Sequence, residues 1–251
     1  MNNYQFEICA NSVESCLAAQ TGGANRVELC AGIPEGGTTP SYGEIKTARR
    51  VLTTTHLHVI IRPRGGDFLY TPLELERMTE DIAVARQLGA DGVVFGCLTP
   101  DGDVDTNSCK LLMEAAQGMS VTFHRAFDNC RDPFRALEDI IALGCDRILT
   151  SGQRPTAYDG IPLLKELNSR ADGRLTILAG CGVNEKNIAE IAIQTGVHEF
   201  HFSAREAQPS LMKYRNPDVY MGDADADETT IMRTTERRVR ATIEALKTEG
   251  M

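Results

Sequence analysis

The sequence predicts a single-domain α/β fold, a (β/α)8 TIM barrel followed by a C-terminal loop and helix extension. Three observations support this prediction. The length of 251 residues suits one barrel, strand and helix patterns alternate along the chain, and a short junction motif recurs. We place the barrel core in residues 1–204 and expect the extension, residues 205–251, to pack on the barrel.

A glycine-containing junction recurs between helical patterns and β-prone runs. Its copies read TGGANRVEL, LGADGVVFG, LGCDRILTSG and TGVHEFHFSA. Glycine just past a helix end supplies the left-handed cap that many helices need. Helical-period segments such as DPFRALEDIIAL precede these junctions, and there we expect Asp132 as N-cap and Pro133 as first helical residue. The repeat therefore indicates helices that alternate with strands.

Strands are expected in eight places, with a helix between successive strands. They are Gln5–Ala10, Arg26–Cys30, Leu57–Arg62, Gly92–Phe95, Ser120–His124, Arg147–Thr150, Thr176–Ala179 and Glu199–Phe202. A doubly wound open sheet is the alternative fold. The lack of a GxGxxG motif after the first strand disfavours it.

The chain changes character after Ala204. The segment REAQPSLMKYRNPDVYMGDADADETT is polar and contains two prolines and the acidic run DADADE. We expect a long loop here, mobile in part, and then a final helix from about Thr235 to Lys247.

Charge and composition disfavour several classes of function. The formal net charge of -9 would repel nucleic acids and anionic membrane surfaces. The N-terminal MNNYQFEIC does not resemble a signal peptide, and no apolar run approaches the roughly 20 residues of a membrane span. The eight cysteines form no CxxC pair. We expect a reduced, cytoplasmic protein that binds neither nucleic acid nor membrane.

Alternation along the strands sorts apolar from polar side chains. The apolar sets should pack under the helices, which leaves the polar sets facing the barrel axis. Near the carboxyl ends of the strands this brings together Glu7, Glu28, Arg62, His124 and His201. Barrel enzymes keep their active sites at that end. The structural alternative is a buried ion-pair network, Glu7 and Glu28 with Arg62 and Arg125, that only plugs the barrel.

Acid–base catalysis is one interpretation of these residues. Carboxylates beside imidazoles suit proton transfer, so Glu7, Glu28, His124 and His201 are the candidate catalytic residues if the protein is an enzyme. The same side chains could instead hold a divalent metal ion. No lysine lies at a predicted strand end, which disfavours Schiff-base chemistry.

Loops after the last three strands suggest an anion site. Glycines and backbone amides at this place form the usual phosphate pocket of barrels, and arginines can clamp a carboxylate or phosphate. The candidate anion-binding residues are Arg62, Arg125, Ser151, Gly180, Gly182 and Ser203. The glycines could equally serve as ordinary turn residues. We expect Asp128 to cap the loop onto the next helix.

The first two strands both carry a Glu-x-Cys sequence, EIC and ELC. Adjacent strands lie about 4.8 Å apart, so Cys9 and Cys30 could lie side by side facing the axis. Two soft thiolates so placed would suit Cu(I). They could also be unbonded core cysteines or an adventitious disulfide.

These residues also belong to a longer resemblance. From Glu7 to about Gly222 the chain resembles the CutC copper homeostasis family, through EICANSVES, GGANRVELCAGIPEGGTTPS, IIRPRGGDF, LGADGVVFGCLTPDGDVD, VTFHRAFD, DRILTSGQ, GVNEKNI and MKYRNPDVYMG. The resemblance implies a (β/α)8 barrel, a cytoplasmic homo-oligomer, and Cu(I) bound by Cys9 and Cys30. One departure is Cys181, in GCGV where the family commonly has GAGV. We expect Cys181 to fill space.

Two functions follow from the sequence. The favoured one is a cytoplasmic Cu(I)-binding protein of the CutC type, involved in copper homeostasis. The alternative is a barrel enzyme that uses acid–base chemistry on a small anionic substrate, phosphorylated or not. A purely structural scaffold would leave the polar strand ends unexplained.

Overall fold

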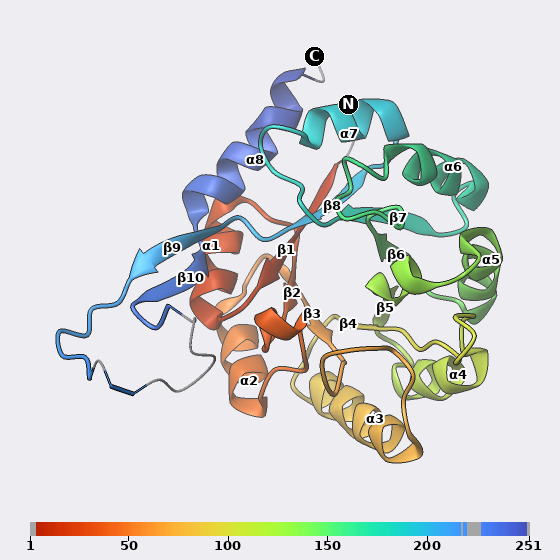
Figure 1. Ribbon diagram of the computed structural model, residues 1–251, viewed down its shortest axis with the longest axis horizontal. Helices are drawn as coiled ribbons and strands as arrows, with labels where there is room; N and C mark the ends of the chain where they lie inside the picture. Colours follow the sequence, from red (N-terminus) through yellow and green to blue (C-terminus); the bar gives the residue numbers. More distant parts are fainter. Residues whose placement is uncertain (1–3, 217, 220–226, 250–251) are drawn as a thin grey trace.

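The protein is a closed barrel of eight parallel strands (Figure 1). The computed structural model describes residues 4–216, 218–219 and 227–249. The barrel strands are β1 (Gln5–Ala10), β2 (Arg26–Leu29), β3 (His56–Ile60), β4 (Gly92–Phe95), β5 (Ser120–Phe123), β6 (Arg147–Thr150), β7 (Thr176–Gly180) and β8 (Glu199–Phe202). Pairing of β8 with β1 closes the ring, so the predicted fold class is confirmed.

Helices surround the barrel on its outside (Figure 1). They are α1 (Val13–Gly22), α2 (Tyr42–Val51), α3 (Pro72–Gln87), α4 (Thr106–Ala115), α5 (Pro133–Leu143), α6 (Ile161–Ala171), α7 (Ile188–Thr195) and α8 (Glu236–Glu249). Asp132 caps α5 by accepting hydrogen bonds from the backbone N–H groups of Phe134 and Arg135, as predicted. Within the described residues, no helix is both long and apolar enough to cross a bilayer.

Three strands end earlier than the sequence predicts. β2 ends at Leu29 and not Cys30, β3 covers His56–Ile60 and not Leu57–Arg62, and β5 ends before His124. At Arg62 the reason is visible, because its backbone N–H donates to Oγ1 of Thr39, in the loop after β2. The polar residues at these positions therefore belong to the loops of the barrel mouth.

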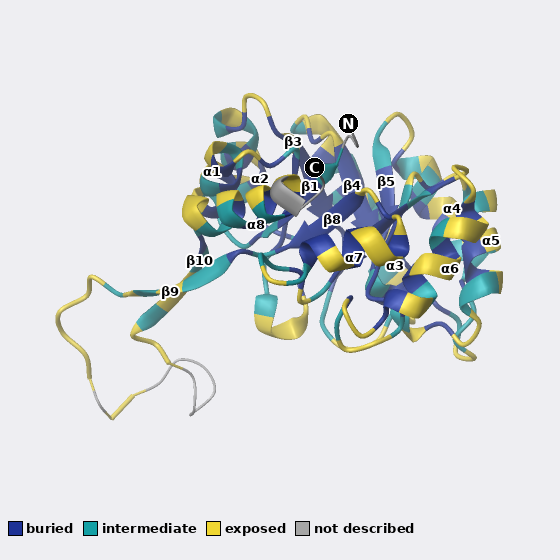
Figure 2. Ribbon diagram, turned by 90° about the horizontal axis from the view of Figure 1, so that it is seen from above, coloured by how far each residue is buried: buried dark blue, intermediate teal, exposed yellow. Residues whose placement is uncertain are grey.

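The hydrophobic core lies between the strands and the helices. Outward residues of the strands, among them Ile8, Val27 and Val59, are fully buried in one cluster with Met78 of α3 and Leu137 of α5. Figure 2 shows the same arrangement, with buried strands inside and exposed residues on the outer faces of the helices. Because the apolar sets face outward, the polar sets line the barrel axis, as the alternation predicts.

The segment after β8 differs from the expected loop. β9 (Arg205–Pro209) and β10 (Thr230–Thr234) pair as an antiparallel ribbon, with Arg205 opposite Thr234. The ribbon projects away from the barrel (Figures 1 and 2). The loop prediction is therefore wrong for these residues, because strand pairing satisfies backbone groups that a loop would leave to water. Most of the acidic run DADADE, residues 223–226, lies outside the described residues.

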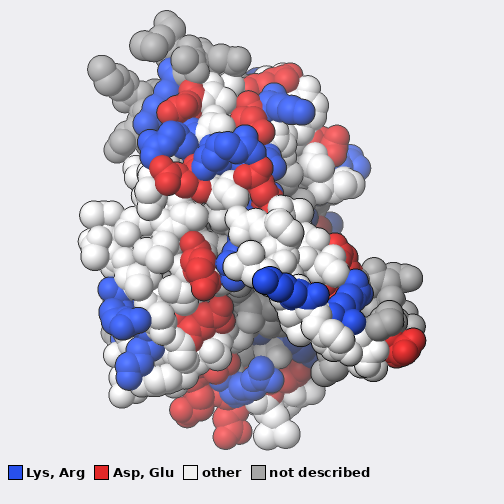
Figure 3. Space-filling model, turned by 90° about the vertical axis from the view of Figure 1, so that its left-hand side faces the viewer, with Lys and Arg blue, Asp and Glu red and all other residues white. Residues whose placement is uncertain are grey.

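Helix α8 completes the ring of helices and packs beside α1 and α7. Its bounds, Glu236–Glu249, lie within two residues of the expected ones. Acidic and basic side chains are interspersed on the face that carries the ribbon (Figure 3). The division of the chain at residue 204 stays a prediction.

Candidate functional site

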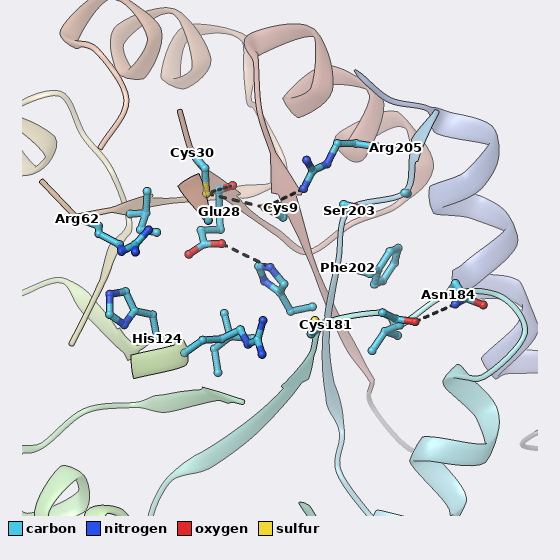
Figure 4. Close-up of a pocket in the computed structure, with 18 of the residues that line it drawn as sticks. Cys9, Glu28, Cys30, Arg62, His124, Cys181, Asn184, Phe202, Ser203 and Arg205 are labelled. Carbon is cyan, nitrogen blue, oxygen red and sulfur yellow. Dashed lines mark hydrogen bonds and ion pairs between the residues drawn. The ribbon is translucent and has the colours of Figure 1, made fainter. Parts of the chain in front are cut away.

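A cavity of about 580 Å³ lies at the carboxyl ends of the barrel strands (Figure 4). Nine of the residues predicted from the sequence line its wall: Cys9, Glu28, Cys30, Arg62, His124, Arg125, Gly182, His201 and Ser203. Three others, Glu7, Ser151 and Gly180, are buried away from the wall. The structure therefore brings most of the candidate residues to one place.

Two free thiols meet on one side of this cavity. The Sγ atoms of Cys9 and Cys30 are 3.9 Å apart, well beyond the S–S bond length of about 2.05 Å in a disulfide. Cys9 is partly exposed, whereas Cys30 is buried. A carboxylate oxygen of Glu28 lies within 4.8 Å of both sulfur atoms. This trio is a possible set of metal ligands.

The two thiols differ in how readily they lose a proton. The hydrogen bond from Cys30 lowers the pKa of Cys9 well below its usual value, and His201 and Arg205 add to the effect. The same hydrogen bond, together with burial, raises the pKa of Cys30 well above its usual value. Cys9 is therefore the thiol of the pair that loses its proton more readily. A thiolate is the form of cysteine that binds metals.

His201 connects the thiols to the barrel interior below them. Its Nδ1 lies 2.8 Å from Oε1 of Glu7, and its Nε2 lies 3.5 Å from Oε2 of Glu28. Burial alone would lower the pKa of His201, but Cys9, Glu7 and Glu28 raise it well above the usual value. These contacts favour the protonated ring, and Nδ1 shares a hydrogen bond with Glu7.

Burial also raises the pKa of Glu28 to about 8. This carboxyl group is consequently largely protonated near neutral pH, despite the positive charge of His201 beside it. A second possible ligand set consists of Glu7, Glu28 and His201. All three of its residues are buried, whereas the cysteine set includes the partly exposed Cys9 and is therefore the more accessible to a metal ion.

Beneath the cavity, an ion-pair network fills the barrel. Arg26 binds Glu7 through Nε and lies 2.6 Å from Glu199 through Nη2. Arg147 lies 2.9 Å from the same oxygen of Glu199, and its Nη1 donates to Oγ of Ser120 at 2.7 Å. Although burial alone would raise the pKa of Glu7, Arg26 and His201 hold it well below its usual value.

The predicted plug of Glu7 and Glu28 with Arg62 and Arg125 is wrong in its partners. Glu7 pairs with Arg26, which begins β2 on the same inward face as Glu28. Arg62 instead donates to backbone carbonyls, from Nη1 to Glu35 and Gly37 at 2.8 and 2.9 Å and from Nη2 to Gly66 at 2.8 Å. Arg62 thus holds the loops after β2 and β3 together, because it lies beyond the end of its strand.

His124 faces the cavity from the end of β5. Its Nδ1 accepts a hydrogen bond of 3.2 Å from the backbone N–H of Ala126, which leaves the ring hydrogen on Nε2. Burial, with the nearby charge of Arg62, lowers the pKa of His124 to about 3, so the ring is neutral. Nε2 is buried and has no hydrogen-bond partner among the residues that the structure describes. A group with so low a pKa suits hydrogen-bond donation better than proton transfer near pH 7.

Asp128 links the loop after β5 to the loop after β6 through hydrogen bonds. It accepts hydrogen bonds from Nε of Arg125 at 2.6 Å and from the backbone N–H groups of Ser151 and Gln153, both at 3.1 Å. The predicted cap on the next helix is wrong, because Asp132 performs it. Ser151 is fully buried within this cluster, where its hydroxyl contacts Asp128 and Arg125.

The β7 and β8 ends serve the site in other ways. A Cβ on Gly180 would come within 2.5 Å of Leu149 and 3.2 Å of His201, so the glycine makes room for the imidazolium. Cys181 and Gly182 both have left-handed backbones, with φ of 76° and 73°. The thiol of Cys181 donates to the carbonyl of Pro155 at 3.1 Å and belongs to neither possible ligand set among the described residues.

Arg205 is a cavity residue that the sequence analysis did not single out. Its Nη2 lies 3.7 Å from Sγ of Cys9, and Figure 4 shows its side chain directed at that sulfur. The signal was present, because the alternation that places His201 and Ser203 on the inward face continues to Arg205. Because a loop was expected after Ala204, the alternation was not extended to Arg205.

Comparison with known proteins identifies relatives. Residues 4–206 match the model of the CutC family. A CutC family protein of Bacteroides thetaiotaomicron is 68% identical over 248 residues, covering 98% of this chain and 100% of the relative. One from Porphyromonas gingivalis strain W83 is 52% identical over 97% of this chain and 98% of its own length. A solved structure from Streptococcus agalactiae, described as a candidate copper homeostasis protein CutC, has 37% identity and a TM-score of 0.77, covering 80% of this chain and 98% of that one.

Proposed function

This chain belongs to the CutC family, and we propose that it binds Cu(I) in the cytoplasm as part of copper homeostasis. The pair of free thiols, with sulfur atoms 3.9 Å apart at the wall of a cavity, carries the proposal. Soft thiolate ligands favour Cu(I) over the harder divalent cations. The role described for the Streptococcus agalactiae relative agrees with it. Eight free cysteines are typical of a reducing compartment and support the cytoplasmic location.

The charges around the two thiols suit Cu(I) bound by both sulfur atoms. Cu(I) held by two thiolates leaves one negative charge, and the cationic Arg205 and His201 both lie close to Cys9. Both cysteines bind Cu(I) as thiolates, and of the two Cys9 gives up its proton more readily. Copper is the cargo here, and Cys9 offers it the more accessible of the two sulfur atoms.

Cu(I) affinity of cysteine variants tests this proposal. Under anaerobic conditions, a chromophoric Cu(I) chelator would compete with the full chain for equimolar Cu(I). We expect Cys9→Ser and Cys30→Ser to weaken binding by more than the roughly 10–100-fold that losing an outer partner of a metal ligand costs. The matched control is Cys181→Ser, which changes a thiol on the same cavity but outside the pair. An unchanged affinity in the double variant Cys9→Ser, Cys30→Ser would rule the pair out.

We also propose that the chains form a homo-oligomer through the β9–β10 ribbon. The ribbon leads into a segment whose Leu211, Met212 and Tyr214 side chains are 95%, 76% and 74% exposed. Exposed apolar groups of this kind often mark contacts between proteins. Light scattering of the wild-type chain should give a mass above one protomer, and Leu211→Asp with Met212→Asp should lower it. A monomeric wild-type chain would contradict the proposal.

A further inference from the structure

We propose that the cavity also binds a small organic oxyanion, a carboxylate or a phosphate ester, which accepts a hydrogen bond from Nε2 of His124. The inference goes beyond copper binding, since it concerns a different ligand and a different wall of the cavity. Figure 4 shows His124 and Arg62 on one side of the cavity, and Ser203 and Arg205 on the other.

The His124 donor is the first observation behind the proposal. Its ring is 4% exposed, and its orientation is fixed by the hydrogen bond from Ala126 and by the Phe68 ring, whose centroid is 5.0 Å away. Across the described part of the chain, Nε2 finds no acceptor. A buried N–H without an acceptor is unfavourable, and buried groups in folded proteins are rarely left so. A ligand in the cavity would supply the missing acceptor.

The charge of the wall determines which acceptor fits. Among the described residues that line the cavity are four arginines and one carboxylic acid, Glu28. Arg125 pairs with Asp128 and Arg238 with Glu185, whereas Arg62 and Arg205 have no carboxylate partner in the described part of the chain. Glu28 already faces His201 across 3.5 Å. The whole chain, by contrast, carries a formal net charge of -9. A concave, cationic wall in an acidic protein concentrates anions.

The size and lining of the cavity favour an organic anion over a bare ion. Its volume of about 580 Å³ lies within the range of roughly 300–1,000 Å³ that is typical of sites for small molecules. Apolar side chains also line the wall, namely Ile60, Phe68, Leu149, Val183 and Phe202. These would contact the carbon skeleton of the ligand while His124 donates to its oxyanion.

Of the arginines, Arg62 acts here mainly through its charge, which no carboxylate compensates among the described residues. The terminal nitrogens of Arg62 are engaged with the carbonyls of Glu35, Gly37 and Gly66, and Arg125 is held by Asp128 and Ser151. Two donors on this side remain without an acceptor in the described part of the chain, Nε2 of His124 and Nε of Arg62, and His124 is the one whose ring can be replaced without removing a charge. This differs from a phosphate pocket at the Gly180–Gly182 turn, because both asparagines after that turn, Asn184 and Asn187, donate to the carbonyl of Gly182.

Titration calorimetry with two probes tests the inference. Malonate represents carboxylates and glycerol 3-phosphate represents phosphate esters, each added to the full chain at an ionic strength held constant with sodium chloride. We expect at least one probe to bind with one site per chain, and the better probe identifies the chemical class. His124→Phe should weaken it at least tenfold, whereas His124→Gln, which keeps an N–H near the position of Nε2, should lose less.

Controls separate this site from copper binding and from misfolding. His198→Phe changes a histidine that packs against Tyr4, outside the cavity, and should bind the probe like wild type. The double variant Cys9→Ser, Cys30→Ser should also retain probe binding. In wild-type protein labelled with nitrogen-15, the Nε2–H resonance of His124 should shift as the probe binds. The inference is overturned if neither probe binds, if His124→Phe binds as tightly as wild type, or if that resonance does not move at saturation.

Discussion

The barrel interior has two ends, a floor beneath the cavity and a mouth that forms the cavity wall. Both contain charged and imidazole side chains, but these differ in their access to the cavity. In the floor, Arg26 and Arg147 share Glu199, and Glu7 completes a network whose charges are paired. In the mouth, His124 Nε2 and Arg205 Nε are buried and lack a hydrogen-bond partner within the described residues, and in the floor the same is true of His58 Nδ1. Both ends bury polar groups, so burial alone does not distinguish structure from function. Incomplete hydrogen bonding at the cavity wall does, because His124 and Arg205 line the cavity and can meet a ligand there, whereas His58 is not among the lining residues.

His201 lies at the boundary between the two ends. It takes one neighbour from the floor, Glu7, and two from the mouth, Glu28 and Cys9. Glu7 in the floor therefore stabilises the charged form of His201, and that charge in turn affects Cys9 and Glu28 in the mouth. The floor thereby raises the pKa of His201 through Glu7, and His201 in turn lowers the pKa of Cys9.

Breaking the floor should have the largest effect on stability. Arg26→Met removes the cation between Glu7 and Glu199, which are both buried. Leaving buried charges without their partner costs roughly 3–5 kcal/mol of the free energy of unfolding. Urea denaturation followed by circular dichroism would measure this loss.

Arg174→Met is the matched control for the floor. Arg174 forms an ion pair of 2.7 Å with Glu138, but both side chains are about half exposed. Water screens such a pair, so we expect an unchanged unfolding midpoint. A midpoint for Arg26→Met that equals the control value would show that the floor network does not stabilise the fold.

Sequence patterns predicted the faces of the strands but not the partners of the charges. Alternation placed Glu7, Arg26 and Glu28 inside the barrel, and the structure agrees. It could not tell that Glu7 would pair with Arg26 and not with Arg62. Pairing depends on depth along the barrel axis and on loop conformation, and Arg62 finds its acceptors in loop carbonyls that no side-chain pattern encodes.

The ribbon after β8 illustrates a second limit of the sequence. β9 and β10 pair over a separation of about twenty residues of intervening chain, and neither strand has a strong apolar alternation. Their pairing depends on tertiary placement beside α1, not on local propensity. Cys9 and Cys30, by contrast, could be placed together from the sequence because their strands are adjacent in the barrel.

Acid should destabilise both ends through their neutral histidines. Burial lowers the pKa of His58, in the floor, and of His124, in the mouth, to about 3, against about 6.5 in the unfolded chain. The unfolded state therefore binds more protons between pH 6.5 and 3, so each histidine reduces stability as the pH falls through that window. The slope is at most about 1.4 kcal/mol per pH unit for each histidine.

The variant His124→Gln isolates the share of the mouth in this slope. His201, whose pKa is raised, contributes stability that is fully present below pH 6.5, so it does not add to the loss in this window. Urea denaturation at several pH values should show a shallower decline for His124→Gln than for wild type. Parallel curves for the two proteins would mean that the His124 ring is not held neutral.

The smallest effect on stability is expected from a charge in the mouth. Arg205→Met removes a cation near Cys9, but no buried carboxylate depends on it, so the free energy of unfolding should change by less than about 1 kcal/mol. Its effect should appear in the chemistry of Cys9, since the hydrogen bond from Cys30, His201 and the charge of Arg205 together lower the pKa of that thiol. Alkylation of Cys9 by iodoacetamide near pH 6 should slow several-fold, measured by peptide mass spectrometry.

Arg238→Met is the control for this experiment, because Arg238 also lines the cavity but pairs with Glu185 at 2.9 Å. Its Cys9 should react at the wild-type rate. If Arg205→Met instead destabilised the fold as strongly as Arg26→Met, the mouth would be as closed a network as the floor. If it left both stability and Cys9 reactivity unchanged, the thiolate would depend on Cys30 and His201 alone. We expect Arg205→Met to keep the wild-type free energy of unfolding while Cys9 is alkylated more slowly. This combination follows only if the floor residues stabilise the fold and the mouth residues control the reactivity of Cys9.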